Sequence, residues 1–222
     1  MKYVLPYSAK TLQENAVYVM SLYIGYLSCR KINFFDFHWK SDVFCFQSFM
    51  ETDGAILFSK TSNSILGAYR ENIICSQNPT MFARKAKTAF ADAENVRKQD
   101  VQYLLSYMIT AYEEDETPSE KITTAIWSVQ DTIYSCDAED TFDEYSGGFL
   151  KIFGHCGISA IEEYFVDEYA VTPEQIHFAR TLWEAKKKNH SIKQETVRPF
   201  LSECVNPSLV EDAIRDFGIC AT

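Results

Sequence analysis

Apolar residues recur at helical spacing along most of the chain. Between residues 118 and 136 they follow one another at intervals of three or four and fall on one helix face: Ile122, Ile126, Val129, Ile133 and Cys136. Thr117 and Glu120 have the spacing of a capping box, and Pro118 would occupy the first helical position. The pattern therefore predicts a helix over residues 118–136.

A second segment carries the same signals and predicts a helix from residue 173 to 188. Thr172 and Gln175 have the spacing of a capping box, and Pro173 lies at the first helical position. The lysines at 186–188 suit the negative end of a helix dipole. Similar periodicity predicts further helices within residues 16–29, 78–98, 100–114, 157–170 and 206–217, with Gly218 as the C-terminal cap of the last one.

The segment 31–76 is ambiguous between helix and strand. Alternating aromatic residues at 33–39 and 43–49 are compatible with strands, whereas Ile65, Leu66, Tyr69 and Ile73 have helical spacing. We favour helix in a chain that is otherwise helical, and leave open a small β element within 31–76. With only 8 Gly and 6 Pro, the chain has few tight turns, which argues against a many-stranded β-sandwich. We expect one all-α domain over 1–222, a bundle of roughly eight helices.

Composition and cysteine usage indicate a globular protein of the cytoplasm. At 222 residues and 46% hydrophobic content, the chain can bury a core without a disulfide or a metal ion. The seven cysteines include no CxxC pair, as is typical of reduced, mostly buried thiols. The apolar stretch at 16–29 is too short for a membrane span, and the N-terminal segment lacks the uninterrupted apolar core of a signal peptide.

Negative charge is concentrated in the middle of the chain. Residues 113–170 contain 15 acidic and 2 basic residues, whereas residues 1–112 have a net charge of +3 and residues 171–222 are neutral. The cluster predicts an electrostatic field directed at a basic partner. With a sequence pI near 4.9 and no P-loop or GxGxxG motif, direct binding of nucleic acid is not expected.

Several kinds of chemical site fit the sequence poorly. Read from Asp137, an EF-hand would need Gly at position 6 and Glu at position 12, where the chain has Phe142 and Gly148. Glu174 and His177 form one ExxH motif, but a di-iron bundle needs two. The acidic clusters at 113–116 and 137–144 would lie at opposite ends of a helix about 28 Å long, too far apart to share a metal. A looser divalent-cation site at either cluster stays open, and no cofactor is expected.

The sequence supports two hypotheses about function. The first is an acidic cytosolic protein-binding module of the inhibitor or immunity type. It would neutralise a basic protein, such as a toxin or a nucleic-acid-handling protein, through an acidic helical face. The residues predicted to form that face are Glu113, Glu114, Asp115, Glu116, Asp137, Glu139, Asp140, Asp143 and Glu144. The alternative is an enzyme with a site assembled around His155, Cys156 and the carboxylates of 137–144.

Overall fold

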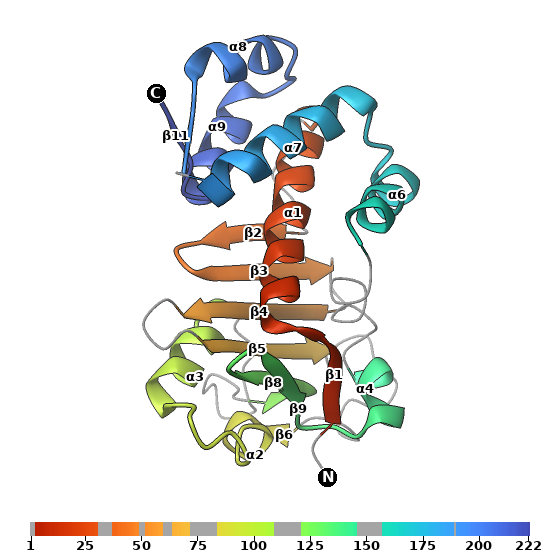
Figure 1. Ribbon diagram of the computed structural model, residues 1–222, viewed down its shortest axis with the longest axis vertical. Coiled ribbons are helices and arrows are strands. Elements are labelled where there is room, and N and C mark those ends of the chain that lie inside the picture. The colour runs from red at the N-terminus through yellow and green to blue at the C-terminus, as the bar shows by residue number, and fades with distance from the viewer. Residues whose placement is uncertain are drawn as a thin grey trace, which may run out of the picture. The chain divides into compact units, whose positions relative to one another are not determined.

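The computed structural model describes residues 3–30, 37–48, 52–59, 64–71, 84–108, 121–145, 157–188 and 190–222. The chain forms two compact units, one made of residues 1–12 and 42–155 and the other of residues 13–41 and 156–222. The first unit is built on a β-sheet, and the second is mainly helical (Figure 1).

The main sheet has seven strands in the order β1-β9-β8-β5-β4-β3-β2, and every neighbouring pair from β1 to β3 in this order is antiparallel. The longest ladder joins β4 and β5 and runs from Thr52 opposite Glu71 to Ser59 opposite Ser64. The strands are β1 (Tyr3–Ser8), β2 (Phe37–Lys40), β3 (Val43–Ser48), β4 (Thr52–Ser59), β5 (Ser64–Glu71), β8 (Thr124–Val129) and β9 (Thr132–Ser135).

The prediction of an all-α bundle is therefore wrong, and the clearest error is the helix expected over 118–136. The described part of this segment contains β7 (Lys121–Ile122), β8 and β9, and β8 pairs with β9 through a two-residue turn at Gln130 and Asp131. The residues of β8 from Thr124 to Ser128 are all buried, so both of its faces lie in the interior. A strand buried on both faces shows no alternation, and its apolar run can mimic helical spacing.

The preference for helix within 31–76 is also wrong, because the described part of this segment forms β2 to β5. The β element left open for this segment is present, but it is four strands of the main sheet and not a small element. On β3, Phe44 and Phe46 are as deeply buried as Val43 and Cys45, which point to the opposite face. Apolar residues on both faces again remove the alternation by which a half-exposed strand is identified.

Two short helices cover one face of the sheet in the first unit (Figure 1). Alternate residues of β3, β4, β5 and β8 pack against α2 (Ala86–Ala89), the turn that follows it, and α3 (Lys98–Leu105). Trp127 of β8 contacts Phe90, with their ring centroids 6.5 Å apart. β6 (Arg84–Lys85) pairs with β7, and α4 (Glu139–Tyr145) follows β9. The helix predicted for 78–98 is thus reduced to the single turn of α2 within its described part.

The second unit contains the helices that the sequence predicts best. It comprises most of α1 (Ala9–Leu27) and the strand β2, with α6 (Ile158–Tyr169), α7 (Pro173–Lys188), α8 (Gln194–Ser202), α9 (Pro207–Asp216), β10 (Ser191–Ile192) and β11 (Cys220–Ala221). The predicted capping box of α7 is present: Thr172 N–H donates to Gln175 Oε1 at 2.8 Å, and Gln175 N–H donates to Thr172 Oγ1 at 3.3 Å. Gly218 adopts a positive φ of 78° just beyond α9, as a C-terminal cap requires.

Aromatic rings fill the interior between α1 and α6. Tyr26 of α1 contacts Tyr169 of α6 edge to face at 4.9 Å between ring centroids, and Phe165 stacks on Tyr169 at 4.9 Å. None of the described helices combines the length and the apolar character that a bilayer span requires.

Candidate functional site

The acidic residues predicted to bind a partner have different surroundings. Glu113, Glu114, Asp115 and Glu116 lie outside the described residues, as do His155 and Cys156 of the alternative enzyme site. Asp137, Glu139 and Asp140 are described, and Asp143 and Glu144 belong to α4. The clusters cannot be said to lie at opposite ends of a helix, because the helix expected between them is a set of strands.

Asp137 is buried, with its side chain 1% exposed. Its carboxylate pairs with the guanidinium of Arg84 and accepts a hydrogen bond from the hydroxyl of Thr124. Its backbone N–H donates to Ser135 Oγ at 3.1 Å. A carboxylate with these partners joins β6, β8 and the end of β9, and it is not available to a partner protein at the surface.

Cys136 lies beside this ion pair and is a poor candidate for a nucleophile. Burial raises the pKa of its thiol to about 11, and the neighbouring carboxylate of Asp137 adds to the rise. The backbone N–H of Ala125 points at its sulfur from 3.3 Å. The thiol therefore stays protonated near neutral pH, whereas nucleophilic attack needs the thiolate.

Glu139 and Asp140 differ from Asp137 because both are exposed. They occupy the first turn of α4, where negative charge is favoured by the helix dipole. Neither forms an ion pair with a described lysine or arginine. These two residues keep the exposure that the sequence hypothesis requires, although their position also has a local structural explanation.

A second acidic surface lies on α6, which contains four carboxylates and no lysine or arginine. Ile161 and Phe165 point into the core of the second unit. On the outward side, Glu163 and Asp167 are exposed and Val166 is 45% exposed. Residues three and four positions apart are neighbours on a helix, so these three side chains share one surface. We call Glu163, Val166 and Asp167 the α6 acidic face.

The remaining carboxylate of the first turns of α6, Glu162, holds the helix in place. It accepts two hydrogen bonds from Arg180 of α7, both at 2.8 Å, and one from the hydroxyl of Tyr18 of α1. Burial alone would raise the pKa of Glu162, but the hydrogen bonds from Arg180 and Tyr18 outweigh it, and the net shift is downward. Burial and the carboxylate together raise the pKa of Tyr18, which therefore stays protonated and donates. These hydrogen bonds to α1 and α7 therefore fix the position of the helix that carries the α6 acidic face.

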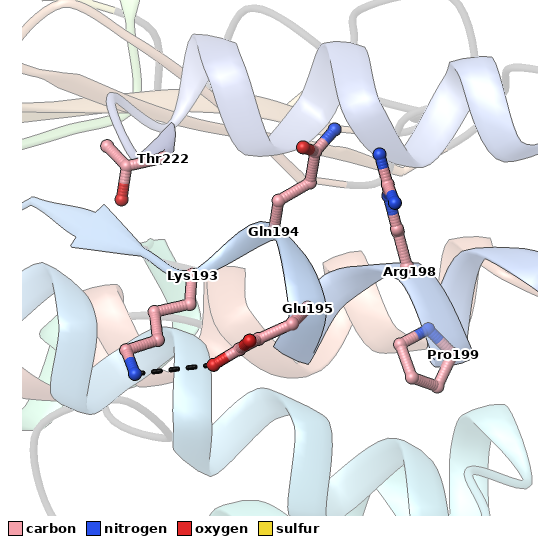
Figure 2. A pocket seen from close by; sticks show the side chains of 6 residues that line it. All are labelled: Lys193, Gln194, Glu195, Arg198, Pro199 and Thr222. Atoms are coloured by element: carbon pink, nitrogen blue, oxygen red, sulfur yellow. Dashed lines mark ion pairs between the residues drawn. The ribbon is translucent and has the colours of Figure 1, made fainter.

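Two hollows lie along α8 in the second unit, and they share Gln194 and Arg198. One, of about 750 Å³, is lined by Lys193, Gln194, Glu195, Arg198, Pro199 and Thr222 (Figure 2). The figure shows Gln194 and Arg198 pointing to the same side of α8, while Lys193 and Glu195 pair at 3.3 Å. The other, of about 760 Å³, lies between α8, α9 and β11 and is more apolar.

The ExxH motif of Glu174 and His177 lies on α7 with both side chains exposed. Across the described ranges, no group of three or more His, Cys, Asp or Glu side chains is placed to hold a metal ion. Neither the α6 acidic face nor the hollows along α8 were identified from the sequence. The lack of basic residues in α6 is a sequence signal that could have identified the α6 acidic face. The hollows along α8 have no such signal.

Searches of protein-family models, curated proteins and solved structures find no match for this chain.

Proposed function

We propose that the protein is a cytosolic binding module of the inhibitor or immunity type, which neutralises a basic partner protein through the α6 acidic face. The observation that carries this proposal is the charge at the C-terminal end of α6. Asp167 and Glu168 occupy its last turn, and this turn contains no basic residue. Negative charge at this end opposes the helix dipole, so helix stability does not account for it.

The chemistry of the α6 acidic face supports a protein partner. Glu163 and Asp167 have no ion pair with the described basic residues, whereas Glu162, Asp53 and Asp137 are each paired with an arginine. Unpaired exposed carboxylates attract a basic surface from a distance and speed the encounter. Val166, exposed between them, supplies an apolar contact of the kind that lies inside a polar rim in protein interfaces.

An acidic face of this kind is also suited to inhibition. A protein that handles nucleic acid holds the phosphate backbone with lysine and arginine side chains. A rigid array of carboxylates can occupy the same basic cleft and block it. Glu139 and Asp140 of α4, predicted from the sequence, are an exposed acidic pair in the first unit and a separate candidate for contact with a basic protein.

Observations on the described residues do not favour the alternative enzyme. Of the 137–144 carboxylates, Asp137 is committed to Arg84 and Thr124. A catalytic proposal therefore loses its most buried acid, and the neighbouring Cys136 thiol is held in its protonated form.

The test is capture of partners from a native lysate, followed by association kinetics with the captured protein. The double reversal Glu163→Lys/Asp167→Lys should slow association at least about tenfold at low salt, with less effect at high salt. A matched control, Glu94→Lys/Glu203→Lys, makes the same change in net charge at two other exposed positions. The parallel variant Glu139→Lys/Asp140→Lys tests α4.

The apolar contact is tested separately. Val166→Ala should speed dissociation, whereas Val205→Ala, which truncates another exposed valine in the second unit, should not. If the α6 reversal and its control slow association equally, the effect belongs to net charge and the proposed face is wrong. A partner that binds at the same rate at all ionic strengths also contradicts the proposal.

A further inference from the structure

The groove between α8 and α9 has an apolar floor that belongs to the second unit alone. Val197 of α8, Ile214 of α9 and Ile219 form this floor, and Leu201 and Ala221 extend it toward solvent. The ribbon of β10 and β11 fixes one end, since Gln194 N–H donates to the carbonyl of Thr222 at 2.9 Å. The volume of about 760 Å³ falls in the range of about 300–1,000 Å³ typical of small-molecule sites.

The rim of the groove carries a net positive charge. Arg198 and Arg215 contribute two guanidinium groups and Glu211 one carboxylate. Arg215 is engaged by Asp212 on its own helix. Arg198 has no ion pair with any described residue, and its side chain extends from α8 on the side of Gln194 (Figure 2). Arg198 is therefore the guanidinium available to an anionic ligand, at the edge of an apolar surface.

We propose that this groove binds a small amphiphile with an aliphatic body and a single carboxylate. The guanidinium of Arg198 would hold the carboxylate with paired hydrogen bonds, the strongest contact available to that anion. The aliphatic body would cover Leu201 and the floor of the groove. Glu211 in the same rim disfavours a second negative charge on the ligand, so a monoanion suits the lining better than a phosphate monoester.

The exposed thiol of Cys220 reports on occupancy, because it lines the groove. Cys29 is also exposed but lies at the end of α1, outside the groove, and serves as an internal control. The experiment measures the rate at which iodoacetamide alkylates each thiol in the full chain as decanoate is added below its micellar concentration. At ten times its dissociation constant, decanoate should slow alkylation of Cys220 about tenfold, since only free protein reacts. The rate at Cys29 should stay the same.

Two variants and one further probe assign the contact. Arg198→Gln should raise the decanoate concentration needed for half protection by about tenfold or more, because it removes a charge-assisted hydrogen bond. Lys193→Gln removes the same charge from the neighbouring polar hollow and should leave protection unchanged. Decyltrimethylammonium, with the same chain length and the opposite charge, should not protect Cys220.

Three results overturn the inference: no protection of Cys220 by decanoate, equal protection by the cationic probe, or unchanged protection in Arg198→Gln. The experiment is independent of the proposed function, because Glu163→Lys/Asp167→Lys should bind decanoate normally.

Discussion

Replacing Asp137 should destabilise the first unit, although the residue lies in the acidic segment that the sequence assigns to the surface. Asp137→Ala removes the acceptor of the Thr124 hydroxyl, which is completely buried. An orphaned buried hydroxyl costs about 1–3 kcal/mol. Breaking a fully buried ion pair costs about 3–5 kcal/mol, but the side chain of Arg84 is 28% exposed and can recover part of its hydration. We therefore expect a loss of about 2–4 kcal/mol in the free energy of unfolding, a large share of the 5–15 kcal/mol of a typical protein.

The assay is equilibrium unfolding in urea, followed by far-ultraviolet circular dichroism. Asp137→Asn keeps an oxygen for Thr124 and should lose only about 1–2 kcal/mol. The control Glu139→Ala/Asp140→Ala removes two exposed carboxylates nearby and should cost no more than about 1 kcal/mol, the loss of their favourable interaction with the dipole of α4. If Asp137→Ala is as stable as this control, the ion pair with Arg84 does not support the fold, and the description of Asp137 as a structural residue is wrong.

Three further predictions concern pH, packing and thiol reactivity. Because the pKa of Glu162 is lowered by folding, its ionised carboxylate stabilises the fold, fully at pH values above the unfolded pKa of about 4.5. This stabilisation is lost as the pH falls through the folded pKa. The thermal unfolding temperatures of Glu162→Gln and the wild type should therefore differ at pH 7 and converge in acid. Gly54→Ala should cost about 1–3 kcal/mol in urea unfolding, because the new methyl group would overlap the ring of Phe46; an unchanged midpoint would contradict this packing. At pH 8, mass spectrometry should find Cys136, with its pKa of about 11, alkylated far more slowly than Cys29, and equal rates would refute the buried thiol.

The helices with explicit end signals could be predicted from the sequence. At α7, Thr172, Pro173 and Gln175 identify the start, and the structure contains the reciprocal hydrogen bonds that this pattern predicts. At α9, Asn206 accepts a hydrogen bond from Leu209 N–H, and Gly218 closes the other end. These signals are local, so they can be recognised without knowing what each helix packs against.

The sheet could not be predicted because its defining contacts are not local. The ladder of β5 and β8 joins Leu66 to Trp127, which are about 60 residues apart in the sequence, and β8 is buried on both faces. The residues of the turn between β8 and β9 do not indicate a hairpin either. Gln130 has a φ of 56°, a conformation in which Gly, Asn or Asp would be expected, so the usual hairpin signal is missing.

The net charge of the central segment could be counted from the sequence, but which of its acidic side chains are exposed could not be predicted. Asp137 and Glu139 are two residues apart, yet one is enclosed by strands and the other faces solvent. Asp137 follows β9 closely and contacts Arg84 and Thr124, whereas Glu139 begins α4, so the difference depends on contacts made far along the sequence. The α6 acidic face could not be predicted for the same reason, because the side of α6 that faces solvent depends on which of its residues the neighbouring helices bury.

The side-chain amide of Gln175 both caps the start of α7 and joins this helix to the end of α1. Its oxygen accepts the N–H of Thr172 at the start of α7, and its nitrogen donates to Ser28 Oγ, just beyond the end of α1, at 2.9 Å. A lysine could make only the second contact. A glutamate could make both only if the Ser28 hydroxyl became the donor, and its charge would then be buried at this position. Where the helix begins and where it docks are thus specified together, and few amino acids other than glutamine could meet both demands at this position.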